Sequence, residues 1–381
     1  MIRHARAAVV VATLGTAACL DRAPAAPVGP PSVSPPFERV LYIPVARPFT
    51  SLLTPVADAD RFYADHVAGP VVAFDRKTGE RVWAFERPLG APSSLVLADG
   101  LLLFVGPYAI ALDAATGQER WRFDPGGDGG LAVSAAGSGG FYFGTDSSMF
   151  ALSVATGALQ WRYDFGFGWE HRSVVRGVAV HGDRVYVSVE RFYSITGHLA
   201  TGIVLALDRI TGAELWRHTE GDGTDRHYFI FEPRVAGDIL LVADHQANVT
   251  IALDRETGAE RWRRAGDPGG FFGAFEPPLV SNDTVFSLSA DRWITALDRS
   301  TGALLWEQHV EGSLSSGAFC GRLLMVQDLS LHVLDRATGE LVARYAHRKP
   351  GESGLLVSRF TAHGGEVFVL GNLAAYSFRC R

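Results

Sequence analysis

The residues that could support catalysis or bind a metal ion are scattered through this sequence. The chain has 12 histidines and 3 cysteines among its 381 residues, and histidines such as His181 and His245 do not recur at a spacing that binds a metal. Two acidic segments, 124–128 and 222–225, contain the oxygen ligands that calcium prefers, but ordinary Gly-Asp turns have the same composition. The sequence contains neither the Gly-x-Ser-x-Gly turn of serine hydrolases nor the His-Glu-x-x-His motif of zinc proteases. We therefore assign no catalytic residue, no metal ligand and no cofactor-binding residue.

A second group of candidates combines aromatic and charged side chains. An aromatic residue followed by glutamate occurs as Trp169-Glu170, Phe231-Glu232 and Phe275-Glu276, and further aromatic or basic residues stand close to these pairs. The candidates for a partner-binding face are Trp169, His171, Arg172, Arg191, Tyr228, Phe231, Glu232, Phe271, Phe272, Phe275 and Glu276. Aromatic residues and arginine are enriched at protein–protein interfaces, so this composition favours a protein-binding surface.

The overall composition is that of a globular protein that does not bind nucleic acid. Apolar residues make up 47% of the chain and charged residues 20%, which is typical of a packed domain. The 35 basic and 41 acidic side chains give a net charge of −6, whereas a nucleic-acid-binding protein carries a basic surface.

The elements that must position these candidates come from one internal repeat. An Ala-Leu-Asp-like tripeptide followed by Thr-Gly recurs seven times, and six of the seven copies have a tryptophan four residues after the glycine. The glycines of the copies are Gly79, Gly117, Gly157, Gly212, Gly258, Gly302 and Gly339. The tryptophans are Trp83, Trp121, Trp161, Trp216, Trp262 and Trp306. Aspartate and glycine at this spacing predict a tight turn between two strands, and short β-like runs such as 239–243 and 284–288 lie upstream.

The repeat predicts an all-β fold, an eight-bladed β-propeller of four-stranded antiparallel blades. The copies are about 43 residues apart, which is the size of a propeller blade, and residues 38–381 have room for eight. The strands 366–370 and 373–378 start an eighth blade that the chain ends too early to complete. We predict that the unassigned strand 38–44 supplies the missing strand and so closes the ring without a free edge.

These residues resemble the pyrroloquinoline-quinone (PQQ) repeat over about nine tenths of the chain. One branch of that family consists of quinoprotein alcohol dehydrogenases, which bind PQQ and calcium. Another consists of non-catalytic lipoproteins similar to the outer-membrane β-barrel assembly factor BamB. In both branches the repeat tryptophan packs between blades, so the resemblance implies this role for the six tryptophans named above.

The predicted topology places the aromatic–Glu segments on one face of the ring. They precede the first strands of blades 4, 5 and 6, and the surplus segment 191–201 lies between the second and third strands of blade 4. Three interpretations remain open: the pairs fix the innermost strands at the ring centre, they bind a protein partner, or they line a site for a small ligand.

The first 37 residues are predicted to target the protein for secretion and to tether it. Residues 1–18 have a basic start, a short apolar run and small residues, as a secretory signal peptide does. Thr16-Ala17-Ala18-Cys19 resembles the lipobox of bacterial lipoproteins, which implies acylation of Cys19; ordinary cleavage without a lipid is the alternative. Residues 19–37 hold many prolines and form a tether, with the propeller over 38–381.

The two remaining cysteines are expected to approach each other. Cys320 falls near a turn of blade 7 and Cys380 follows the third strand of blade 8, and both positions lie on the same face of adjacent blades. An oxidising compartment would allow a Cys320–Cys380 disulfide to persist.

The sequence favours a non-catalytic, monomeric scaffold of the cell envelope. It would bind a protein partner, with the outer-membrane assembly machinery as one option, either as an outer-membrane lipoprotein facing the periplasm or as a secreted protein. A PQQ- and calcium-binding dehydrogenase is the alternative, but the adjacent cysteines typical of that branch are absent here. A small-ligand sensor also remains open, since one fold hosts many functions.

Overall fold

The fold is taken from a computed structural model of the chain. The structure describes residues 37–44, 55–65, 69–87, 94–126, 133–166, 173–193, 200–221, 232–244, 249–266, 277–289, 292–310, 316–327, 330–346, 357–371 and 374–380. The chain divides into two units, residues 1–30 and residues 31–381, and all described residues belong to the second unit.

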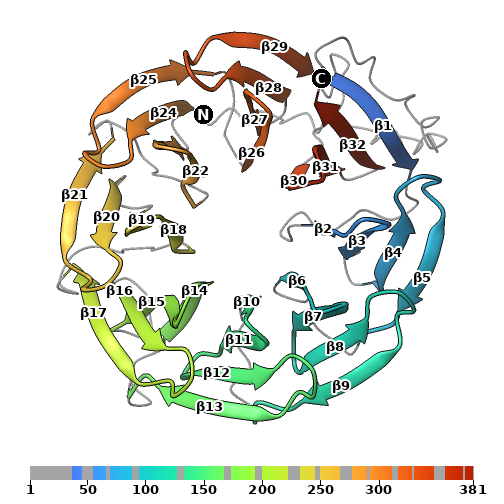
Figure 1. Cartoon of the computed structure of the whole chain (residues 1–381), viewed down its shortest axis with the longest axis vertical. Coiled ribbons are helices and arrows are strands. Elements are labelled where there is room, and N and C mark those ends of the chain that lie inside the picture. Colours follow the sequence, from blue (N-terminus) through green and yellow to red (C-terminus); the bar gives the residue numbers. More distant parts are fainter. Residues whose placement is uncertain are drawn as a thin grey trace, which may run out of the picture. The chain divides into compact units, whose positions relative to one another are not determined.

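The second unit consists of eight four-stranded antiparallel sheets arranged in a ring, as Figure 1 shows. Seven sheets are consecutive in sequence, with their four strands, A to D, ordered from the ring centre outward. Blades 1 to 3 comprise β2 (Val56–Ala57), β3 (Arg61–Asp65), β4 (Val71–Asp75), β5 (Arg81–Phe85), β6 (Leu95–Ala98), β7 (Leu101–Val105), β8 (Ala109–Asp113), β9 (Glu119–Phe123), β10 (Ser134–Gly137), β11 (Gly140–Gly144), β12 (Ser148–Ser153) and β13 (Leu159–Asp164). Blades 4 to 6 comprise β14 (Ser173–His181), β15 (Arg184–Phe192), β16 (Ala200–Asp208), β17 (Glu214–Glu220), β18 (Arg234–Ala236), β19 (Ile239–Asp244), β20 (Val249–Asp254), β21 (Glu260–Ala265), β22 (Leu279–Ser281), β23 (Thr284–Leu288), β24 (Trp293–Asp298) and β25 (Leu304–His309). Blade 7 comprises β26 (Ser316–Cys320), β27 (Leu323–Gln327), β28 (Ser330–Asp335) and β29 (Leu341–Ala346). The predicted eight-bladed architecture is confirmed.

The eighth blade is completed by the N-terminal strand. Strands β30 (Val357–His363), β31 (Glu366–Gly371) and β32 (Ala374–Cys380) form its inner part, and β1 (Phe37–Pro44) pairs antiparallel with β32 from Phe37↔Cys380 to Pro44↔Ala374. In Figure 1 the blue β1 lies beside the dark red β32 at the rim. The predicted closure is therefore correct, although the strand begins at Phe37, which the sequence assigned to the tether.

The repeated x-x-x-Thr-Gly turn joins strands C and D in seven blades, and its first residue is aspartate in six of them and Ser153 in blade 3. In blade 5, for example, Asp254 Oδ1 accepts hydrogen bonds from the backbone N–H groups of Glu256 and Thr257 at 3.0 and 2.8 Å. The hydrogen bond from Arg261, together with these backbone bonds, lowers the pKa of Asp254 to about 2. A β-bulge follows each turn one residue before the Trp position, for instance between the partners of Ala252 and Leu253. Bulges twist an edge strand and so disfavour pairing with another chain.

Each of the six tryptophans reaches from its own blade to the next one. The indole N–H donates a hydrogen bond of 2.7–3.1 Å to a backbone carbonyl in the C–D turn of the following blade. The ring also lies against the glycine of that turn: a Cβ added to Gly302 would lie 2.7 Å from Trp262, and Gly302 has a φ of +69°. Glycine is therefore required here both for its backbone conformation and for the space that the indole occupies.

The hydrophobic core consists of eight clusters, one at each joint between neighbouring blades. Six joints contain a repeat tryptophan, and the two joints of blade 8 do not. At the joint of blades 8 and 1, Phe62 stacks on Phe368 at 5.4 Å, and Arg76 lies over the Phe368 ring and pairs with Glu366 at 3.1 Å. Different contacts thus stabilise the joint at which the ring closes.

Blade 4 differs from the expectation for its surplus residues. The segment 191–201 was expected to form a loop, but Arg191 and Phe192 continue β15, and Ala200 and Thr201 begin β16. The sequence assignment was wrong here because Arg191 pairs with both Ser173 and Thr201, so backbone hydrogen bonding extends the sheet. Strands of nine residues result, compared with five or six in the B strands of the other blades.

The described chain contains no helix that is long and apolar enough to cross a membrane.

Candidate functional site

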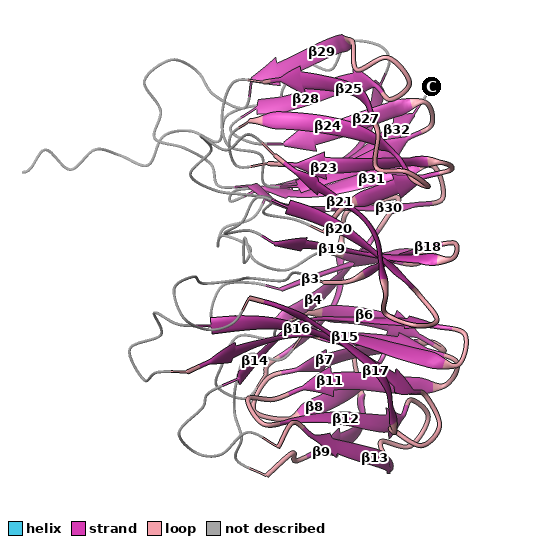
Figure 2. Ribbon diagram, turned by 90° about the vertical axis from the view of Figure 1, so that its left-hand side faces the viewer, coloured by secondary structure: helices cyan, strands magenta, loops and turns pink. Residues whose placement is uncertain are grey.

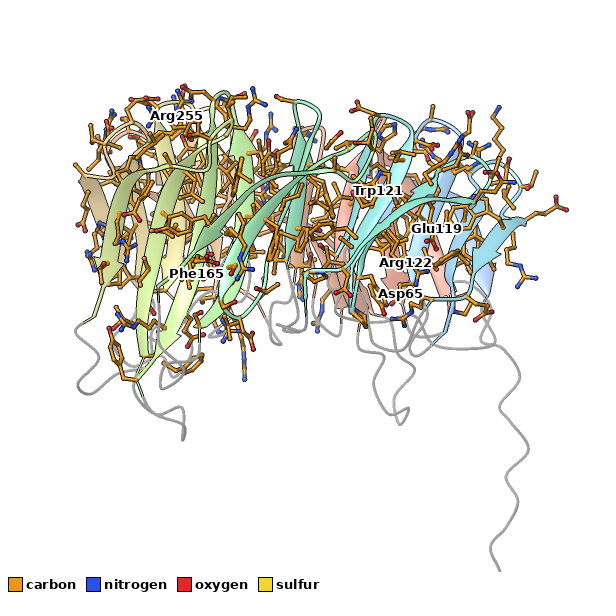
Figure 3. All side chains as sticks on the ribbon, turned by 90° about the horizontal axis from the view of Figure 1, so that it is seen from below. Asp65, Glu119, Trp121, Arg122, Phe165 and Arg255 are labelled. Carbon is orange, nitrogen blue, oxygen red and sulfur yellow. The ribbon has the colours of Figure 1, made fainter. Side chains whose placement is uncertain are left out.

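The two faces of the ring differ in which turns and strand ends lie on them. The A–B and C–D turns lie together on one face, which we call the turn face; they are the pink connections on the right of Figure 2. The opposite face, which we call the loop face, is where strands B and D end. Figure 3 shows this arrangement, with Arg255 at the turn face and Asp65 and Phe165 toward the loop face.

Most of the predicted partner-binding residues lie outside the described residues. Of the eleven candidates the structure describes only Arg191 and Glu232. The remaining ones are Trp169, His171, Arg172, Tyr228, Phe231, Phe271, Phe272, Phe275 and Glu276, and their role stays a prediction.

Arg191 belongs to a hairpin, β15–β16, that extends blade 4 at the loop face. Its guanidinium lies over the Tyr193 ring at 4.9 Å, a cation–π contact, and Thr201 Oγ1 donates a hydrogen bond of 3.2 Å to the Tyr193 hydroxyl. Arg191 and Tyr193 are both half-buried. The hairpin therefore presents an ordered aromatic–arginine pair at its end, which is the composition that protein interfaces favour.

A buried carboxylate, Glu190, precedes Arg191 in β15. Glu190 is fully buried and accepts a 2.6 Å hydrogen bond from Nε of Arg176, whose side chain is 31% exposed. Burial raises the pKa of Glu190 to about 7; Arg176 opposes this shift, and the nearby buried carboxylate of Asp244, in blade 5, adds to it. Folding therefore favours the protonated form of this carboxyl group.

Glu232 links blade 5 to the same part of blade 4. A Cβ added to Gly177 would lie 2.0 Å from Cα of Glu232, so the chain leading into β18 packs directly on β14. Gly177 follows the bulge at Arg176, the residue whose side chain donates the hydrogen bond to Glu190. For this one aromatic–Glu pair, backbone packing gives physical support to the interpretation that the pair fixes an inner strand. In the sequence, only the glycine at position 177 marks this close contact. Its role could not be recognised there, because the contact is made by a residue of another blade.

Cys320 forms a disulfide bond. It is the last residue of β26 and is buried at the joint of blades 7 and 8, in one cluster with Val367 and Phe378 of blade 8. Cys380 ends β32 two residues after Phe378, and its side chain is not among those described. We propose Cys380 as the partner, which would add a covalent link at a joint that lacks a tryptophan.

One group of side chains has the composition of a metal site. His218, Glu220 and Glu260 have donor atoms within 4.8 Å of one another on the outer strands β17 and β21. Arg263 already bonds both carboxylates, at 2.8 Å to Glu220 and 2.6 Å to Glu260, and His218 bonds Glu220 at 2.7 Å. His218 and Arg263 counter the effect of burial and lower the pKa of Glu220. This group is a satisfied ion-pair network between blades 4 and 5.

Eight four-stranded blades, seven of them with this turn and six with this tryptophan, define a β-propeller built from PQQ-type repeats. The sequence model of a family described as "Outer membrane protein assembly factor BamB" matches residues 67–191 and 200–379. The chain therefore belongs to the BamB family.

Solved structures show the same fold at low sequence identity. BamB from Moraxella catarrhalis has a TM-score of 0.68 and 19% identity, with 90% of this chain and 99% of that chain covered. Quinohemoprotein alcohol dehydrogenase from Comamonas testosteroni has a TM-score of 0.63 and 15% identity, with 90% of this chain and 76% of that chain covered. The computationally designed protein Ika8 has a TM-score of 0.70 and 15% identity, with coverages of 90% and 99%. No curated protein matches the chain.

Proposed function

We propose that this chain is a non-catalytic scaffold of the cell envelope whose loop face binds a protein partner. The observation that carries the proposal is the extended β15–β16 hairpin, which presents Arg191 and Tyr193 in an ordered contact at the loop face. In the C–D turn of blade 4, on the other face, Arg209 donates hydrogen bonds to the backbone carbonyls of Gly182 and Ser138.

Membership of the BamB family supports a partner in outer-membrane protein assembly. The predicted signal peptide and Cys19 would place the chain at the periplasmic side of the outer membrane, with residues 19–36 as the tether. Labelled palmitate should become attached to the native chain and not to a Cys19→Ala variant. A native chain that takes up no label would contradict the anchor.

Partner capture from solubilised envelope tests the scaffold role. Replacing Trp169, Tyr228, Phe231 and Phe272 with alanine should abolish capture while the melting temperature stays within a few degrees of the native value. If the variants instead unfold, these aromatics are structural; if they fold and still capture the partner, the loop face is not the binding surface.

A quinone-dependent dehydrogenase is the second candidate, because a quinohemoprotein alcohol dehydrogenase shares the fold. Neither the cysteine positions in the sequence nor the acidic group found among the described residues fits PQQ and calcium. The three cysteines, Cys19, Cys320 and Cys380, are not adjacent in sequence, and the acidic group of His218, Glu220 and Glu260 is paired with Arg263 on outer strands. If PQQ and calcium raised the melting temperature by several degrees, the scaffold proposal would fail.

A further inference from the structure

The outer strands of blades 6 and 7 each begin with two exposed aliphatic side chains, at positions where every other blade with this turn has at least one polar or charged residue. The two positions after the Thr-Gly-x turn are Leu304 and Leu305 in blade 6, and Leu341 and Val342 in blade 7. These four side chains are between 39% and 54% exposed. Both positions are apolar in these two blades only; the equivalent pairs are Glu119-Arg120 in blade 2 and Glu260-Arg261 in blade 5.

The charged blades use these positions for ion pairs along the exposed edge. Glu119 pairs with Arg122 at 2.7 Å and Glu260 with Arg263 at 2.6 Å, each three residues along the outer strand. Leucine at positions 304 and 341 removes the acidic member of such a pair. Charged side chains on an edge strand keep it in water, so two consecutive exposed apolar residues at the start of each of two neighbouring edge strands favour contact with a less polar medium.

The position of these strands relative to the chain start indicates what covers them. Strand β1 is the outer strand of blade 8, next to blade 7 in the ring (Figure 1). Because Phe37 pairs with Cys380, the chain enters blade 8 at the turn-face end of the outer strand. Leu304 and Leu341 begin their strands directly after a C–D turn, at that same end. On the other side of blade 8, Val82 of blade 1 occupies the second of the two positions and is 47% exposed.

We propose that the outer edge of blades 6 and 7 rests on a lipid bilayer, with Leu304, Leu305, Leu341 and Val342 entering its interfacial region. The inference rests on the proposed acylation of Cys19, since the tether would bring the ring within reach of the membrane, with this side of the ring close to the point where the tether enters blade 8. Residues 19–36 would reach about 55 Å at most in the polyproline form, so the anchor alone would leave the orientation of the ring free. A few partly inserted aliphatic side chains add weak, reversible membrane affinity and would fix that orientation.

Vesicle flotation tests this without the acyl chain. The full chain carrying Cys19→Ala is mixed with vesicles of phosphatidylethanolamine and phosphatidylglycerol, and its partitioning is measured. Adding Leu305→Gln and Leu341→Gln should lower partitioning by about tenfold or more. The matched control is Leu159→Gln, the equivalent position in blade 3, which is 50% exposed and should leave partitioning unchanged.

Three outcomes would overturn the proposal. The Cys19→Ala chain could fail to float, all three proteins could partition equally, or sedimentation could show self-association that Leu305→Gln abolishes, which would assign the edge to a second copy of the chain. Partner capture is measured on the same proteins. Capture retained with lost flotation contradicts the membrane contact alone, whereas flotation retained with no capture contradicts the scaffold role alone.

Discussion

The contact between Trp262 and Gly302 allows a quantitative test of how the blades are joined. Gly302→Ala places a methyl group 2.7 Å from the indole at a φ of +69°. The left-handed backbone conformation costs alanine about 1–2 kcal/mol, and overpacking costs typically about 1–3 kcal/mol more. We therefore expect the free energy of unfolding to fall by about 2–5 kcal/mol.

A matched variant separates the two contributions. Gly100 has a φ of +75°, and a methyl group added there would have no atom within 4 Å, so Gly100→Ala should show the backbone cost alone, about 1–2 kcal/mol. In a Trp262→Ala background, Gly302→Ala should likewise cost only about 1–2 kcal/mol, because the indole is gone.

The assay is urea unfolding followed by far-ultraviolet circular dichroism on the four variants and the native chain. Equal costs for Gly302→Ala and Gly100→Ala would refute the reasoning, since the indole would then not fill the space beside the glycine. An unchanged cost of Gly302→Ala in the Trp262→Ala background would refute it independently.

Three further predictions concern the joints of blade 8 and the buried carboxylate. With Cys380 as partner, the disulfide closes a loop of about 60 residues, so Cys320→Ala should lower stability by about 4 kcal/mol, and dithiothreitol should lower the melting temperature of the native chain but not of the variant. Arg76→Ala removes one partner of the buried Glu366, which keeps Arg379, and should cost about 2–3 kcal/mol by urea unfolding; no loss would mean that Phe62 and Phe368 suffice at this joint. Burial raises the pKa of Glu190 from 4.5 to about 7, so the folded state binds this proton more tightly and stability should rise by about 2–3 kcal/mol as the pH falls from 8 to 5. Glu190→Gln should remove most of that rise, and an identical pH dependence in the variant would contradict the assignment.

The architecture could be predicted from the sequence because most blades repeat the same turn and the same tryptophan position. The Asp–Gly turn depends on residues a few positions apart, and the tryptophan recurs at a fixed offset from it, so spacing alone gave the number of blades. The closing strand β1 followed from the same count, since the chain ended one strand short of a full ring.

The site could be predicted less well because it depends on contacts between blades. The extension of β15 through Arg191 follows from pairing with Ser173 and Thr201, residues that nothing in the local sequence marks as partners. The burial of Glu190 and the approach of the chain at Glu232 to Gly177 likewise join segments that are distant in sequence. The predicted order of the blades led us to expect that Cys320 pairs with Cys380. The structure shows that Cys320 is disulfide-bonded, and Cys380 as its partner stays a prediction.

The most direct test of the scaffold account is photocrosslinking in the intact cell envelope. A photoreactive residue is placed at Tyr193, at the loop face of blade 4, and as a control at Ile210, which is 66% exposed in the C–D turn of the same blade. The account predicts that the residue at position 193 forms a covalent adduct with one envelope protein, identified by mass spectrometry, and that the residue at position 210 does not. Adducts from position 210 alone, or no protein adduct from position 193, would contradict it.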